Sequence, residues 1–112
     1  MLHSDCFFNA SSAAIFFTPN MVALMEACAL ELAKAYLEEG ETTVGAEIHC
    51  RHLAPTPVGM KVTATARLRE IERRKMWFDI EVNDEKGKCG EGWHQLNEGT
   101  ENSAPSSAFQ IF

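Results

Sequence analysis

Apolar residues between positions 19 and 38 recur with the period of an α-helix. At about 100° of turn per residue, one side of this helix collects an apolar stripe suited to a core: Val22, Met25, Ala29, Leu32, Ala33 and Tyr36. Charged residues such as Glu31 fall on the opposite side, as expected for a solvated face. Thr18 followed by Pro19 is typical of a helix start. Gly40 is typical of the residue that follows the C-terminal end of a helix.

Glu26 departs from this pattern, because it lies at the flank of the apolar stripe and not among the exposed charges. Its carboxylate is therefore expected to point toward a helix contact or a cleft. A buried carboxylate is costly unless it finds a partner or shifts its pKa. Two structural alternatives stay open: the side chain reaches the helix edge, or it forms an ion pair with Arg51 or Arg67 of a neighbouring strand.

Beyond the helix the hydrophobic period changes from 3.6 to 2, which is typical of β-strands. The alternation predicts four strands, over residues 43–53, 60–70, 76–82 and 88–96. The residues expected to face inward in the first three are Val44, Ala46, Ile48, Cys50 and His52, then Met60, Val62, Ala64, Ala66 and Leu68, then Met76, Phe78, Ile80 and Val82.

One helix followed by four antiparallel strands with short turns is an α+β arrangement, with the helix packed on one face of the sheet. The last strand is weakened by Gly90 and Gly92. The opening segment shows no periodicity that establishes a strand. A polar stretch at 98–112 is expected to be a loose tail, so we predict a single domain over 1–112 with its core at about 17–97.

Composition narrows the class of protein. A chain of 112 residues with 46% hydrophobic content is suited to one domain with one core. The net charge of −6 argues against nucleic acid or an anionic membrane surface as a partner. Four cysteines are spread singly without metal-ligand spacing, which favours reduced thiols over a zinc site. No signal peptide or run of ~20 apolar residues is present, so we expect a cytoplasmic protein.

His52 is the last inward residue of its strand before a proline-containing loop. Glu26 and His52 are thus expected to face the layer between helix and sheet from opposite sides, and a shifted pKa is what a general base or nucleophile requires. Thr18 lies eight residues before Glu26, roughly 12 Å along the helix axis, where the helix N-terminus favours an oxyanion. The structural alternatives are a helix cap for Thr18 and an ordinary strand-end histidine for His52, while His94 has no feature that marks it as functional.

Taken together, these residues resemble a known family, the hotdog-fold thioesterases, in the group that includes fluoroacetyl-CoA thioesterase. The resemblance covers about residues 17–95 and is carried by FTPNMVALMEACALELAKAYLEEGETTVGAEI, RHLAPTPVGMKVTATARLREIERRKMWFDIEVNDE and GEGWH. It implies a hotdog fold, in which a long helix is wrapped by an antiparallel sheet. It also implies a homodimer or higher homo-oligomer with sheets joined edge to edge and active sites at the dimer interface.

Residue by residue, the family's catalytic threonine, glutamate and histidine match Thr18, Glu26 and His52. Gly45 matches a substrate-binding position beside the acyl group, where a missing side chain lets substrate approach the backbone. The resemblance implies an acyl-CoA substrate. Hydrolysis of such a thioester by these residues needs no metal or redox cofactor.

The chain departs from the family pattern in two places. In the last strand, where the family usually reads Gly-Thr-His-Glu-Arg, this chain has Gly-Trp-His-Gln-Leu at 92–96, which loses the arginine and introduces Trp93. The N-terminal strand is shortened or altered, and Asn9 and Ser12 stand where lid phenylalanines would align. Selectivity for a fluoroacetyl group is therefore not implied.

Two functions are consistent with these features. The first is hydrolysis of a small acyl-CoA thioester, with Glu26 as general base or nucleophile, His52 transferring a proton or polarising the carbonyl, and Thr18 orienting the substrate. The alternative is a non-catalytic hotdog module that binds acyl-CoA or another small ligand, with Trp93 filling part of the pocket. A hydratase-like enzyme is a weaker possibility, because no second acid accompanies His52.

Overall fold

The computed structural model describes residues 3–9, 18–57 and 59–100. The elements, in chain order, are β1 (His3–Asn9), α1 (Thr18–Ala33), the 3₁₀ helix η1 (Lys34–Tyr36), β2 (Glu41–His52), β3 (Lys61–Glu72), β4 (Lys75–Asp84) and β5 (Gly87–Thr100). All strand pairings are antiparallel, which confirms the predicted α+β class.

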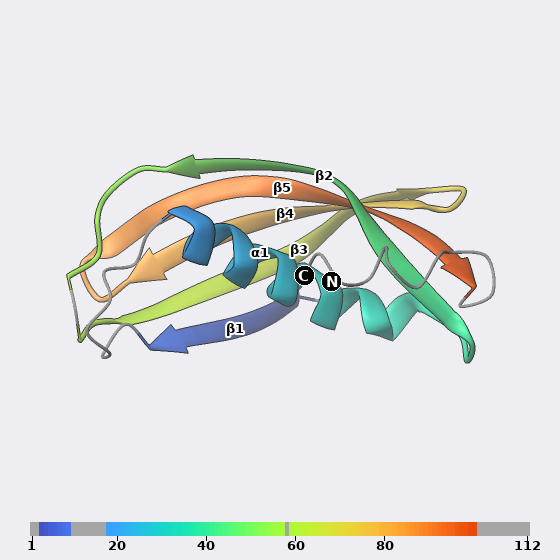
Figure 1. Ribbon diagram of the computed structural model, residues 1–112, viewed down its shortest axis with the longest axis horizontal. Helices are drawn as coiled ribbons and strands as arrows, with labels where there is room; N and C mark the ends of the chain where they lie inside the picture. Colours follow the sequence, from blue (N-terminus) through green and yellow to red (C-terminus); the bar gives the residue numbers. More distant parts are fainter. Residues whose placement is uncertain (1–2, 10–17, 58, 101–112) are drawn as a thin grey trace.

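The five strands form one sheet in the order β1-β3-β4-β5-β2, so β1 and β2 are its edges. Figure 1 shows α1 lying along one face of this sheet, and α1 contacts all five strands. β1 has seven residues and is the shortest strand, in agreement with the expectation of a shortened first strand. β5 continues to Thr100, past the core limit expected at 97, and residues 101–112 lie outside the described part of the chain.

The core lies between α1 and the inner face of the sheet. As predicted, alternate residues of β3 and β4 are buried: Val62, Ala64 and Ala66 in β3, and Met76, Phe78, Ile80 and Val82 in β4. Leu68 is partly buried against this core, and Met60, also expected to face inward, precedes β3. Within the described ranges no helix is long and apolar enough to cross a membrane.

The helix ends earlier than the expected boundary at residue 38. α1 stops at Ala33, the chain tightens into η1, and Leu37 then takes up an extended backbone. Tyr36 and Leu37 pack against the core from outside the α-helix. The apolar pattern thus continued past the helix because it marks burial and not helical backbone.

A β-bulge in β2 changes which residues of this strand face inward. Gly45 pairs with Leu96 and Glu47 pairs with Gln95, so Ala46 is an extra residue in the ladder. The bulge reverses the alternation, since a one-residue shift moves every side chain to the other face.

The expectation for β2 was therefore right beyond the bulge and wrong before it. Ile48 and Cys50 pack against the core as predicted. Ala46 is exposed, and Thr43 is buried on the face expected for Val44.

Two methionines of α1 pack against glycines of β5. A side chain at Gly90 would overlap with the thioether of Met21, and one at Gly92 would overlap with the carbonyl of His49 and approach Met25. Both methionines are fully buried, although the predicted apolar stripe contained only Met25. The glycines expected to weaken β5 thus allow the helix to lie close to the sheet.

Gly92→Ala is expected to destabilise the fold more than Gly90→Ala. The new methyl at position 92 meets backbone that cannot move without disturbing β2, whereas at position 90 it meets the flexible end of Met21. We expect losses of about 3 and about 1 kcal/mol respectively in the free energy of unfolding. Urea denaturation of both variants measures this difference, and equal losses would contradict the packing described.

Candidate active site

A cavity of about 720 Å³ lies between α1 and the edge of the sheet formed by β2 and β5. The lining residues come from three elements: Thr18, Pro19, Val22, Ala23, Glu26, Ala27 and Leu30 of α1, Thr43 and Gly45 of β2, and His94 and Leu96 of β5. The wall is mostly apolar, with few polar groups converging on it, as is typical of small-molecule sites.

Glu26 projects from the flank of α1 into this cavity, as its position beside the apolar stripe predicted. Its Oε2 atom is buried and has no hydrogen-bond partner. Burial in these surroundings raises the pKa of Glu26 from 4.5 to about 6, because desolvation disfavours the charged form. The carboxylate is still mostly ionised at neutral pH, so it can accept a proton.

The alternative of an ion pair between Glu26 and a nearby arginine is wrong. Arg51 instead binds Glu91, with Nη1 and Oε2 3.0 Å apart. Arg67 and Arg51 both line a hollow on the outer face of the sheet, away from α1. Among the residues that the structure describes, none on the inner face provides a compensating cation for Glu26.

Thr18 and His52 are in direct contact at the N-terminal end of α1. A hydrogen bond of 2.9 Å joins Oγ1 of Thr18 and Nδ1 of His52. Thr18 lines the cavity, and His52 is not among the lining residues. Within one chain the structure thus brings His52 to Thr18 and not to Glu26, which lies two helical turns away, roughly 12 Å along the axis.

Gly45, which matches a substrate-binding position of the family, lines the cavity opposite the helix. Gly45 is the last paired residue before the bulge in β2. Because glycine has no side chain, the backbone of β2 is open to a ligand at this point. The neighbouring inward residue of the strand is Thr43, which also lines the cavity.

His94 is the imidazole that shares the cavity with Glu26, although no feature of the sequence marks it as functional. Its side chain is only 3% exposed, and its Nδ1 atom is buried without a partner. The residues paired with it across the sheet are Phe78 and Ile48, which are apolar. Desolvation lowers the pKa of His94 from 6.5 to about 4, so this imidazole is neutral at pH 7.

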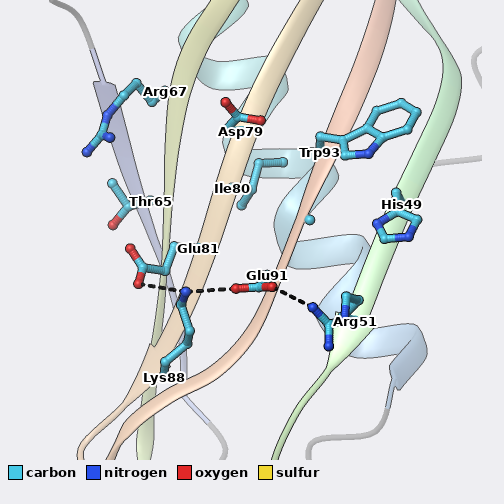
Figure 2. A pocket seen from close by; sticks show the side chains of 11 residues that line it. His49, Arg51, Thr65, Arg67, Asp79, Ile80, Glu81, Lys88, Glu91 and Trp93 are labelled. Carbon is cyan, nitrogen blue, oxygen red and sulfur yellow. Dashed lines mark hydrogen bonds and ion pairs between the residues drawn. The ribbon is translucent and has the colours of Figure 1, made fainter.

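Trp93 does not fill the inner cavity, contrary to the expectation attached to the binding-module alternative. It lies on the outer face, where its ring stacks on His49 with centroids 5.9 Å apart. Figure 2 shows the two rings side by side on β5 and β2. Ser12, aligned with a lid residue, lies outside the described residues, and the structure describes no side chain for Asn9.

The outer hollow, of about 410 Å³, is lined by several charges, of which Arg51, Glu81, Lys88 and Glu91 pair with one another. Lys88 lies between Glu91 at 2.7 Å and Glu81 at 3.5 Å, and Glu91 also binds Arg51, as Figure 2 shows. These groups need no ligand to satisfy them. The inner cavity, with its unpaired carboxylate and imidazole, is therefore the better candidate for an active site.

Solved structures of known proteins share this architecture. The solved structure of a hot-dog-like protein from Thermanaerovibrio acidaminovorans covers 99% of this chain and 90% of its own, with a TM-score of 0.84 and 19% identity. FlK, a fluoroacetyl-CoA thioesterase, was solved as a threonine-to-serine variant in complex with acetyl-CoA. That structure has a TM-score of 0.82 and 27% identity, covering 91% of this chain and 90% of its own. The fold is thus the hotdog fold.

The sequence comparisons agree with the structural ones. Fluoroacetyl-CoA thioesterase of Streptantibioticus cattleyicolor is 38% identical over 81 residues, which are 72% of this chain. The chain spans 58% of that relative's length. A family model described as fluoroacetyl-CoA-specific thioesterase matches residues 4–96. The chain therefore belongs to the fluoroacetyl-CoA-specific thioesterase family.

Proposed function

We propose that this protein hydrolyses a small acyl-CoA thioester in the cavity between α1 and the β2–β5 edge. The observation that carries the proposal is the Glu26 carboxylate, which is desolvated, unpaired at Oε2 and directed into a largely apolar cavity. A carboxylate with a pKa near 6 is suited to general-base or nucleophilic catalysis at neutral pH. Family membership and the acetyl-CoA complex of FlK support acyl-CoA as the substrate class.

The reaction begins from the ionised form of Glu26 in either of two routes. As a general base, Glu26 takes a proton from water while the water oxygen bonds to the thioester carbon. As a nucleophile, it bonds to that carbon itself and forms an anhydride that water then cleaves. In both routes the carbon–sulfur bond breaks, the thiolate of CoA takes up a proton, and the acyl group leaves as a carboxylate.

Thr18 is proposed to contact the substrate at the N-terminal end of the cavity. Its hydroxyl is held by Nδ1 of His52, so His52 acts as a positioning residue for Thr18 within the chain. The backbone N–H groups at the start of α1 favour negative charge at this end. Gly45 leaves space beside β2 for the acyl group.

We also propose that the protein is a homodimer. β2 is an edge strand of twelve residues, and an open edge of this length is suited to pairing with another strand. The helix residues Ala23, Ala27 and Leu30 line the cavity yet are exposed, so the cavity is open on this side. A second copy at this edge would cover these residues and close the cavity.

Glu26→Gln is expected to abolish thioester hydrolysis. The amide is close in size to the carboxylate but can neither accept the proton nor form the anhydride, so kcat should fall at least about 100-fold. Release of free thiol from a panel of short acyl-CoA substrates measures the effect. The matched control is Glu31→Gln on the exposed face of α1, where Glu31 pairs with Lys34, and this variant should keep full activity. Turnover undiminished in Glu26→Gln would exclude the mechanism. If the parent protein binds acyl-CoA tightly and leaves the thioester intact, the binding module is supported instead.

The pH dependence of kcat should report the raised pKa of Glu26. Activity depends on the ionised form, so it should rise tenfold per pH unit below about 6 and level off above it. An inflection near 4.5 would mean that Glu26 is not desolvated in the working enzyme.

The same pKa predicts that Glu26→Gln stabilises the fold at neutral pH. Ionisation above pH 6 costs stability, because the folded-state pKa lies above the ordinary value of 4.5. The variant should gain up to about 2 kcal/mol at pH 7.5, at ~1.4 kcal/mol per pKa unit, and less in proportion to remaining solvent contact. The gain should disappear as the pH falls from 6 to 4.5, and denaturant unfolding at both ends of this range measures it.

Sedimentation velocity tests the homodimer. The expected species has twice the chain mass of 12.5 kDa. Leu30→Glu, at the open side of the cavity, should shift the protein toward monomer and lower its activity. Ile71→Glu is the matched control, because Ile71 of β3 is similarly exposed but neither lines the cavity nor belongs to the β2 edge. A parent protein that sediments as monomer at micromolar concentration would contradict the assembly.

A further inference from the structure

Three buried polar atoms without hydrogen-bond partners in the described part of the chain line the same cavity. They are Oε2 of Glu26, Oγ1 of Thr43 and Nδ1 of His94. They come from α1, β2 and β5, so their convergence is a property of the fold and not of a local sequence motif. Buried polar atoms are normally paired, and a set of orphans around one cavity indicates that a ligand supplies the partners.

The two sheet residues differ from Glu26 in what they can offer a ligand. The Thr43 hydroxyl carries a proton that it can donate, and the side chain is 6% exposed. His94 is 3% exposed, and because its pKa is lowered to about 4 the ring is neutral and carries one N–H. The ionised carboxylate of Glu26 can only accept. The cavity thus presents two potential donors on the sheet side and one acceptor on the helix side.

A thioester carbonyl fits this arrangement. Its oxygen is an acceptor with two lone pairs and its carbon is the atom attacked. If the oxygen lies against the sheet donors, the carbon faces the helix, where Glu26 or its activated water approaches. Donors aimed at the developing oxyanion in a site that excludes water are among the strongest contributions to catalysis.

We propose that Thr43 and His94 form a carbonyl-binding subsite that donates two hydrogen bonds to the thioester oxygen, opposite Glu26. This assignment rests on the proposed thioester hydrolysis. It adds two residues that touch the reacting group to the predicted set of Thr18, Glu26, His52 and Gly45. In this arrangement His94 donates from Nδ1 and stays neutral throughout, because charge develops on the substrate oxygen and not on the ring.

Isosteric substitutions test the subsite by kinetics. Thr43→Val removes the hydroxyl and His94→Phe removes the ring nitrogens, and each should lower kcat about 10- to 100-fold with KM changed less than about threefold. Thr43→Ser and His94→Asn keep a donor near the same place and should retain most of the activity. Both disabled variants lose an unpaired buried polar atom, so their melting temperatures should equal or exceed that of the parent. Normal kcat in Thr43→Val and His94→Phe, with hydrolysis intact in the parent, would overturn the subsite and leave the proposed function standing.

A spectroscopic measurement tests the subsite independently of turnover. Acetyl-CoA carrying ¹³C at the carbonyl is bound to the Glu26→Gln variant, and its carbonyl stretch is recorded by infrared difference spectroscopy. Two hydrogen bonds should lower the stretching frequency relative to acetyl-CoA in solution. Adding Thr43→Val or His94→Phe should move it back upward. A frequency that neither substitution changes would overturn the proposal, whether or not any acyl-CoA is hydrolysed.

Discussion

The structure depends on a balance between burial and pairing in the layer between α1 and the sheet. A buried polar group left without a hydrogen bond costs about 1–3 kcal/mol, which is a large share of the 5–15 kcal/mol that typically stabilises a domain. Thr43 and His94 are buried in this layer, yet each keeps one such atom, and so does the half-buried Glu26. On the outer face, by contrast, the charges around Lys88 pair with one another. The polar groups around Lys88 thus have their partners within the chain, whereas those in the cavity are suited to take theirs from a ligand.

Packing along the two flanks of α1 explains why the cavity exists at all. On one flank Met21 and Met25 lie against Gly90 and Gly92, where the absence of side chains brings helix and sheet into close contact. On the other flank, beside the small side chains of the helix and the bulge at Gly45, lies space that none of the residues described by the structure fills. The tight contact fixes the helix axis, and the open flank then keeps its polar groups at set positions. Rigid elements of this kind hold a site more accurately than loops do.

Periodicity in the sequence was sufficient to predict the helix, four of the strands and the inward faces of β3 and β4, because alternation directly reflects burial on one face. It could not predict the bulge in β2, since one extra residue in a ladder changes pairing without changing composition. Thr43 was missed for this reason. His94 was missed because the two preceding residues of β5 on the same face of the sheet are Gly90 and Gly92. Glycine has no side chain, so the sequence does not indicate which face of this strand is buried. Leu96 lies on the same face, two residues after His94, and its apolar side chain was the signal that could have placed His94 on the buried face.

The opposite pKa shifts of Glu26 and His94 have one cause and one consequence. Desolvation disfavours charge on either group, so it raises the pKa of the carboxylate to about 6 and lowers that of the imidazole to about 4. A protonated His94 in the same cavity would attract the carboxylate and lower the pKa of Glu26, which would weaken it as a base. Because the imidazole is neutral at pH 7, it can donate a hydrogen bond without providing a counter-ion. The apolar surroundings of His94 thus keep Glu26 basic enough to react. Because His52 is bonded to Thr18, two helical turns from Glu26, the imidazole that donates beside Glu26 within each chain is His94 of β5.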